Sequence, residues 1–388
     1  MTFLGLNKKS QMAAAIGVVL VASLLYLCPS KACQFPAIYN FGDSNSDSGA
    51  VSAAFGRLPP PYGETFFGKP SGRYSDGRLV IDFIAEHLGL PFLNAYLDSI
   101  GSNFSHGANF AASGSTMQPV NAKLYEEGFN PLSLNVQLLQ FEQLKDRTEE
   151  IYAQAKSSQI TSNLPKPGDF SKALYTLDSG QNDLHYGLVK LTMKQLKESI
   201  PYIINQFSLS IEKLYQKGAR IFWIHNTGPI GCLPFFVITT PPKPEDTDQS
   251  GCIKSHNGVA QEFNKQLKEQ VSKLRTQLSG ATLYYVDIYT VKYSLIREAN
   301  KYGFLSPLGY CCRHYGDSGL RCWETEKRNG TEIFATSCSD PLKYISWDGI
   351  HYTEAANKWI ANHILDGSFS DPPVPLSKTC SGPGSSSR

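Results

Sequence analysis

The sequence predicts an α/β fold, in which a parallel sheet of about five strands carries helices on both of its faces. Two observations support this prediction. Short apolar runs, such as 36–41 and 220–225, end in glycine or polar residues. Longer segments with apolar residues at helical spacing, such as 134–152 and 199–217, lie between these runs. Strands that alternate with helices in this way are typical of a parallel sheet.

The first predicted strand leads into a dense polar stretch. Residues 35–49 read FPAIYNFGDSNSDSG, and the bulky run 36–41 breaks at Gly42. The polar residues that follow can cap a helix, because Ser, Asp and Asn side chains accept hydrogen bonds from free backbone N–H groups. We expect Asp43 and Asp47 to act as such caps. Ser44 would then lie at the end of a strand, where open α/β sheets place their chemistry.

The remaining elements follow in chain order. Residues 56–78 are rich in Gly, Pro, Arg and Tyr and are predicted to form a long loop. The further predicted helices are 79–88, 134–152, 199–217 and 261–278, and the further strands begin at residues 174, 220 and 283. Residues 371–388 contain few apolar side chains, so we expect a disordered tail, apart from any tether at Cys380. Residues 33–370 are expected to form one domain.

The N-terminus has the features of a secretory signal peptide. Lys8 and Lys9 precede the apolar run 13–27, and Ser30-Lys31-Ala32 has the small-x-small pattern of a cleavage site. The alternative is a membrane anchor, but the run is shorter than the roughly 20 residues that a spanning helix needs. We therefore expect residues 1–32 to be removed. The protein would be secreted to the apoplast or vacuole, without stable membrane insertion.

Secretion would explain the cysteines. The chain has 9, and Cys28 would leave with the signal. The even number that remains favours disulfides, and Cys232 and Cys252, which flank a Pro-rich loop, are expected to pair. The connectivity of the others stays open, with these as candidates: Cys311, Cys312, Cys322 and Cys338. The alternative is a zinc site at Cys311, Cys312, Cys322 and His314, but no C-x-x-C pair is present.

Two sequons, at Asn103 and Asn329, fit a secretory route.

The composition excludes some partners. The formal net charge is +2, from 36 basic and 34 acidic residues, and no basic block stands out. Nucleic acid is therefore not an expected partner. Hydrophobic residues make up 41% of the chain, which is enough for a sizeable core. No motif requires a metal or an organic cofactor, and nothing indicates an oligomeric state.

Polar residues near the C-terminus can supply acid–base chemistry. His351 follows Asp348 by three residues within the stretch 346–357. On a turn that leads into a helix, this spacing lets both side chains reach one cleft. Asp348 could then orient the imidazole of His351, which could accept the proton of Ser44. The alternative is that Asp348 caps a helix and His351 is half-buried. No G-x-S-x-G motif occurs, which argues against an α/β-hydrolase nucleophile elbow.

Four ordered blocks together resemble the GDSL, or SGNH, hydrolase family. They are GDS at residues 42–44, a glycine within 107–115, G-x-N-D at 180–183 and D-x-x-H at 348–351. The resemblance spans about residues 35–364 and is strongest to the early-nodulin-type and latex-allergen-type esterases of plants. It implies a flavodoxin-like three-layer α/β/α fold.

The resemblance also implies residue roles. Ser44, Asp348 and His351 would form the catalytic triad, and Ser44, Gly114 and Asn182 would donate to the oxyanion. Asp183 would fix its loop. The sequence departs from the family pattern at Asn45, where the family name has Leu, and at Tyr352, where many members have Pro. The remaining histidines are read as structural or surface residues: His106, His185, His225 and His314.

The expected substrates are acetyl or other short-chain esters of hydroxyl-rich plant metabolites or polysaccharides, because the loops in the four blocks are polar. Three alternatives stay open. A lipase would act on longer acyl esters and would need an apolar groove. A fucosidase-like glycosidase would use two of the carboxylates of Asp43, Asp47 and Asp183. A secreted binding or defence protein would carry the same site in a silent form.

Overall fold

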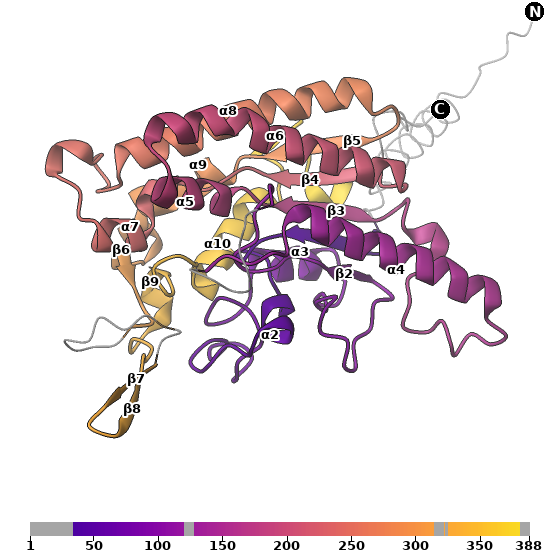
Figure 1. Ribbon diagram of the computed structural model, residues 1–388, viewed down its shortest axis with the longest axis horizontal. Coiled ribbons are helices and arrows are strands. Elements are labelled where there is room, and N and C mark those ends of the chain that lie inside the picture. The colour runs from indigo at the N-terminus through magenta and orange to yellow at the C-terminus, as the bar shows by residue number, and fades with distance from the viewer. Residues whose placement is uncertain (1–33, 120–127, 314–321, 323–324, 381–388) are drawn as a thin grey trace, which may run out of the picture.

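The computed structural model describes residues 34–119, 128–313, 322 and 325–380 (Figure 1). A six-stranded sheet with the order β10-β5-β4-β3-β1-β2 lies at its centre. The strands are β1 (Ile38–Gly42), β2 (Gly107–Asn109), β3 (Leu174–Asp178), β4 (Ile221–His225), β5 (Thr282–Val286) and β10 (Ser370–Asp371). Strands β1 to β5 are parallel, and β10 is antiparallel to β5. The predicted parallel sheet is confirmed, and the antiparallel edge strand is an addition to it.

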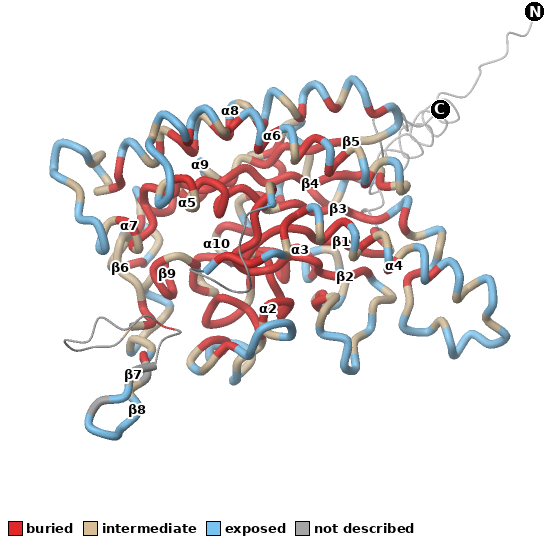
Figure 2. Tube along the Cα trace, viewed as in Figure 1, coloured by how far each residue is buried: buried red, intermediate tan, exposed pale blue. Residues whose placement is uncertain are grey.

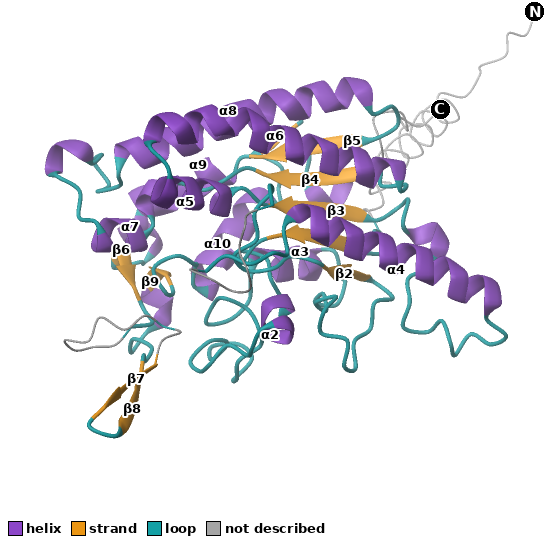
Figure 3. Cartoon of the chain, in the orientation of Figure 1, coloured by secondary structure: helices purple, strands orange, loops and turns teal. Residues whose placement is uncertain are grey.

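Helices cover both faces of this sheet (Figure 3). On one face α4 (Leu134–Gln154), α6 (Met193–Gln216) and α8 (Lys254–Gln277) share a hydrophobic core with inward residues of the strands, such as Tyr39 and Phe41. On the other face α3 (Val80–His87), α9 (Ile288–Arg297) and α10 (Glu354–Ile364) form a second core around residues such as Ile38 and Trp223. Because side chains alternate along a strand, each strand contributes to both cores. Figure 2 shows the buried sheet between the two helical layers.

The strand order determines where a ligand can bind. The first strand, β1, lies between β2 and β3, so the chain order of neighbouring strands reverses there. In open α/β sheets the crevice at such a reversal, beyond the carboxyl ends of the strands, is the usual binding site. The segments that follow β1 and β3 lie at this crevice, and they contain Ser44 and α5 (Gln181–Lys190).

Two short helices lie beside the crevice, and three disulfides join pairs of described residues. Helix α2 (Ala50–Ala54) follows the Ser44 turn, and α7 (Pro234–Thr239) lies next to the bond Cys232–Cys252. That predicted pair is confirmed. Two further bonds between described residues are Cys311–Cys338 and Cys312–Cys322, so three cysteines of the alternative zinc site are held in disulfides. His314, the fourth residue of that alternative, lies outside the described residues.

A small outer part carries one of the two sequons. Strands β6 (Ser306–Tyr310) and β9 (Tyr344–Ser346) pair beside the main sheet, and β7 (Thr325–Arg328) and β8 (Thr331–Phe334) form a hairpin. Asn329 lies in the turn of this hairpin, with a φ of 49°. Asn329 and Asn103 are both exposed, as glycosylation requires.

The C-terminal segment corrects one expectation. Residues 371–380, which were expected to be disordered, pack against the fold through β10, the fully buried Leu376 and the disulfide-bonded Cys380. Arg275 donates hydrogen bonds to the backbone and side chain of Asp371, which fixes the start of the segment. Strand pairing, a buried leucine, a disulfide and these hydrogen bonds thus order a segment of largely polar composition. Residues 381–388 and the predicted signal segment 1–32 lie outside the described residues.

No described helix is both long enough and apolar enough to span a bilayer.

Candidate active site

Ser44 lies in the turn that follows β1. Asp43 accepts hydrogen bonds from the backbone N and the side-chain Nδ2 of Asn45, both at 2.9 Å. The prediction that Asp43 caps a helix is wrong, because its carboxylate closes this turn instead. The predicted cap at Asp47 is confirmed: its side chain accepts from the backbone N–H groups of Gly49, Ala50 and Val51 at the start of α2. Ser44 itself is buried, and it lines a cleft.

Asp348 and His351 form a close pair. Asp348 Oδ2 lies 2.6 Å from His351 Nδ1, and Asp348 Oδ1 accepts from the backbone N of His351 at 2.8 Å and of Ile350 at 3.0 Å. The alternative role of Asp348 as a helix cap is wrong, because Thr353 caps α10. Burial alone would raise the pKa of Asp348. The charge of His351 and these hydrogen bonds outweigh burial, so the pKa lies below its usual value.

Two tyrosines that sequence reasoning missed support this pair. Tyr62 donates its hydroxyl to Asp348 Oδ2 at 2.9 Å. Tyr74 packs against the His351 ring, with 5.1 Å between ring centroids. Both belong to the predicted long loop 56–78, whose abundance of tyrosine is the only signal that the sequence offers. The loop therefore contacts both members of the pair and helps to hold them in place.

Gly114 and Asn182 lie at the same cleft as Ser44. Asn182, in the first turn of α5, donates one Nδ2 hydrogen to the carbonyl of Ser115 at 2.9 Å, which leaves the second hydrogen for a ligand. Gly114 has a φ of +79°, and a Cβ there would lie 2.0 Å from the carbonyl oxygen of Gly128. Only glycine fits at this position. Within the described residues, the backbone N–H groups of Ser44 and Gly114 donate to no protein acceptor.

Buried polar contacts tie these blocks together. Asp47 Oδ2 also accepts from the backbone N of Ser113 at 2.8 Å. Gln137, on the buried face of α4, bonds both backbone groups of Gly42 and donates to Ser115 Oγ at 2.8 Å. Sequence reasoning missed Gln137, although a glutamine on the apolar side of an amphipathic helix is a usable signal. These contacts fix the Ser44 turn relative to Gly114.

A buried charged cluster lies next to the Ser44 turn. Asp43 N donates to the carbonyl of Asp178 at 3.1 Å, and Asp178 Oδ2 lies 3.3 Å from His225 Nδ1. Burial, with the nearby charge of Asp178, raises the pKa of Asp43 to about 7. The Lys292 ammonium is also buried, which lowers its pKa against the opposing effect of the two aspartates. His225 is thus structural, as expected.

Asp183 fixes its loop, as predicted. Its carboxylate accepts from the backbone N of Met117 at 2.8 Å and of Gln118 at 3.2 Å, which joins α5 to the segment after Gly114. Burial, together with the charge of Asp43, outweighs these hydrogen bonds and raises the pKa of Asp183 to about 7.

The raised pKa of Asp183 leads to a pH prediction. Between pH 4 and 7 the folded state binds the proton of this carboxyl more tightly than the unfolded state, so its contribution to stability is present below the unfolded pKa and is lost as pH rises through 7. Asp183→Asn removes this loss. The free energy of unfolding of the variant, relative to that of wild type, should therefore increase by on the order of 2 kcal/mol from about pH 5 to about pH 7.5. Urea unfolding at several pH values measures this difference.

The surface variant Asp246→Asn serves as the control for this measurement and should show no such gain. A stability difference between Asp183→Asn and wild type that does not change with pH would contradict the assignment.

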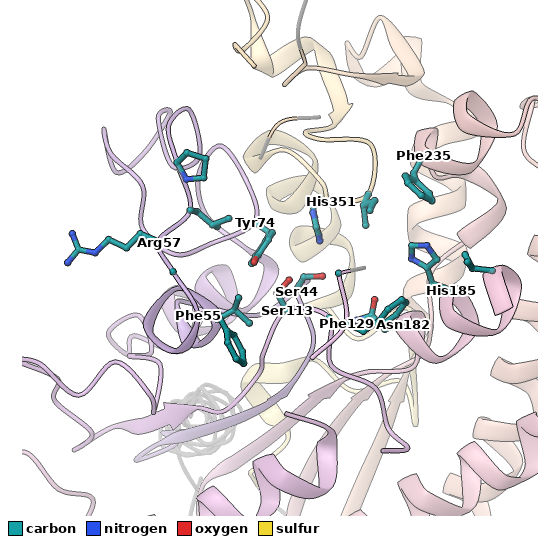
Figure 4. Close-up of a pocket in the computed structure, with 18 of the residues that line it drawn as sticks. Ser44, Phe55, Arg57, Tyr74, Ser113, Phe129, Asn182, His185, Phe235 and His351 are labelled. Atoms are coloured by element: carbon teal, nitrogen blue, oxygen red, sulfur yellow. The ribbon is translucent and has the colours of Figure 1, made fainter. Parts of the chain in front are cut away.

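The cleft unites the predicted residues. Figure 4 shows Ser44, Asn182 and His351 facing one cavity, which has a volume of about 740 Å³. In the described residues Ser44 Oγ forms no hydrogen bond. The hydrogen bond between a catalytic serine and its histidine often tightens only when substrate binds. His185, expected to be structural or at the surface, also lines the cleft.

The walls of this cleft differ from expectation. The polar block loops predicted polar walls, but much of the lining is apolar, and all of these apolar residues except Ile350 lie outside the four blocks: Val51, Phe55, Leu58, Phe129, Val189, Phe235 and Ile350. The sequence indicates one apolar loop candidate, 234–238, held by Cys232 and Cys252, and Phe235 of this run lines the cleft. The other apolar residues reach the cleft through packing that local patterns do not show.

Comparisons with known proteins agree on one family. A family model described as GDSL-like Lipase/Acylhydrolase matches residues 38–364. A GDSL esterase/lipase from Arabidopsis thaliana is 50% identical over 351 residues, which cover 90% of each chain. Alpha-L-fucosidase 3 from Arabidopsis thaliana is 46% identical and covers 95% of this chain and 98% of its own. The GDSL esterase/lipase ENOD8 from Medicago truncatula is 45% identical and covers 94% of this chain and 95% of its own. The resemblance seen in the four sequence blocks is confirmed.

Proposed function

Because this chain belongs to the GDSL-like lipase/acylhydrolase family, we propose that it is a carboxylic ester hydrolase in which Ser44 is the nucleophile. The observation that carries the proposal is the His351–Asp348 pair, in which Nδ1 and Oδ2 lie 2.6 Å apart. His351 lines the same cleft as Ser44, Gly114 and Asn182. A serine hydroxyl is a weak nucleophile until a base takes its proton. His351 is that base, because Asp348 holds its Nδ1 proton and leaves Nε2 free to accept.

The reaction has two halves. Ser44 Oγ bonds to the ester carbonyl carbon while its proton passes to His351 Nε2. The resulting oxyanion accepts hydrogen bonds from the backbone N–H groups of Ser44 and Gly114 and from the free amide hydrogen of Asn182. When the C–O bond breaks, His351 returns the proton to the departing alkoxide. Water then attacks the acyl-enzyme by the same route, which releases the acid and regenerates Ser44.

A glycosidase is the second candidate, since one relative is named a fucosidase. Such an enzyme needs two carboxylates on either side of a sugar ring. The three candidate carboxylates are buried, and none of them lines the cleft: Asp43, Asp47 and Asp183. Each accepts hydrogen bonds from backbone N–H groups instead. This arrangement supports the ester hydrolase.

We further propose that the protein is secreted after cleavage at Ala32. The three disulfides among the described residues support this, because such bonds persist in oxidising compartments. The exposed sequons at Asn103 and Asn329 fit the same route.

A substrate panel tests the proposed activity. Purified protein is assayed with p-nitrophenyl acetate, butyrate and palmitate, and with p-nitrophenyl α-L-fucoside. We expect hydrolysis of esters and none of the fucoside above the rate without enzyme. Release from the fucoside that persists in Ser44→Ala would instead support the glycosidase, and inactivity on the whole panel would favour a binding protein.

A further inference from the structure

The cleft has an apolar wall on each side of Ser44 (Figure 4). The first, which we term the α2 wall, consists of Val51, Phe55 and Leu58, from α2 and the loop after it. The second, which we term the α7 wall, consists of Phe129, Val189 and Phe235 and lies near Asn182. The labelled members of the two walls, Phe55 on one side and Phe129 and Phe235 on the other, have Ser44 between them.

Both walls leave apolar surface open to water. Phe55 is 36% exposed and Val189 is 53% exposed. Apolar side chains that gather in a cavity around a few polar groups are typical of sites that bind apolar ligands. The cavity of about 740 Å³ is also much larger than an acetyl group needs. Three heavy atoms occupy on the order of 100 Å³, judged from the ~30 Å³ share of one water.

The walls are held by contacts outside the catalytic groups. Phe235 N donates to the carbonyl of Gly349 at 2.9 Å, which ties α7 to the loop of His351. The ring of Phe235 contacts those of His185 and Phe236, each with 5.2 Å between centroids. The disulfide Cys232–Cys252 fixes the start of α7, and Asp47 fixes the start of α2. Each wall therefore stands in a defined position relative to Ser44.

An ester has two parts on opposite sides of its scissile bond, and this cleft offers one apolar wall to each. We propose that the two walls are separate subsites, one for the acyl group and one for the alcohol, and that the substrates are esters with an apolar group on both sides. This rests on the ester hydrolase activity proposed above. It replaces the expectation of acetyl groups on hydroxyl-rich alcohols, because its premise of polar walls does not hold.

Two ester series test the proposal. One varies the acyl group, with p-nitrophenyl esters of two, four and eight carbons. The other varies the alcohol, with ethyl, butyl and octyl acetate followed by acetate release. In wild type kcat/KM should rise along both series, by about fourfold for each methylene that a wall buries. The variants Phe55→Ala and Phe235→Ala each shorten one wall, and each should reduce the ratio between the longest and the shortest ester at least tenfold in one series.

The two variants should affect different series, whichever wall binds the acyl group and whichever binds the alcohol. Ile238→Ala is the matched control, since Ile238 lies on α7, is 48% exposed and does not line the cleft. It should leave both series as in wild type. A wild-type profile that is flat or falls in either series would overturn the proposal, and so would variants that change the same series or neither. None of these results would contradict the proposed ester hydrolase activity. That proposal is contradicted only if wild type hydrolyses no ester.

Discussion

Ser44→Ala should reduce kcat/KM for p-nitrophenyl butyrate by a factor of about 10⁶, which is the size of effect expected when the serine of a Ser-His-Asp unit is removed. The substitution deletes the one oxygen that forms the acyl-enzyme, and the remaining oxyanion donors supply only residual catalysis. The fold should be unchanged, because Ser44 Oγ forms no hydrogen bond within the described residues. Thermal unfolding of the variant and wild type checks this.

Ser113→Ala is the control for this prediction, because Ser113 lines the same cleft and its backbone is held by Asp47. Its activity should stay within about tenfold of wild type. A serine-directed phosphonate, followed by peptide mass spectrometry, should label Ser44 alone. Label on Ser113 or Ser115, or Ser44→Ala activity near that of wild type, would overturn the assignment of the nucleophile.

Local patterns were enough to predict most of the sheet. The run at 220–225 contains β4, and the runs at 36–41 and 283–287 match β1 and β5 to within one residue at one end, because a strand buried on both faces must be apolar along most of its length. The residues Gly107–Asn109 form β2 with only three positions, too few for a periodic signal. Strand β10 is shorter still and depends on pairing with β5, a contact that no local pattern encodes.

The candidate site divides in the same way. Ser44, Asn182, Asp348 and His351 were predictable because each lies in a short block whose spacing carries information. Their supports were not: Tyr62 reaches Asp348 across 286 positions, and Gln137 reaches Gly42 across 95. Such contacts depend on how distant segments pack, and a single sequence does not show this. The apolar walls depend on the same packing, since Phe55 and Phe235 line one cleft from segments that are far apart in the sequence.

Asp348→Asn should lower kcat/KM by about 10⁴-fold while the overall fold is retained. The Asn oxygen can replace Asp348 Oδ1, which accepts from the backbone N–H groups of Ile350 and His351. The amide NH₂ then takes the place of Oδ2 and faces His351 Nδ1, so that Nδ1 must accept a hydrogen bond. The proton of the neutral imidazole moves to Nε2, and His351 can no longer take the proton of Ser44. Kinetics with p-nitrophenyl butyrate, together with thermal unfolding, measure both effects.

Tyr62→Phe separates this loss of the correct tautomer from a mere loss of contacts at Asp348. It removes the hydroxyl that donates to Asp348 Oδ2 at 2.9 Å but keeps the carboxylate that orients His351. The loss of one hydrogen bond to a charged group corresponds to about 1.5–3 kcal/mol, so the activity should fall by no more than about a hundredfold. If Asp348→Asn were no more harmful than Tyr62→Phe, Asp348 would serve only to hold the loop. His351 would then need another partner to set its tautomer.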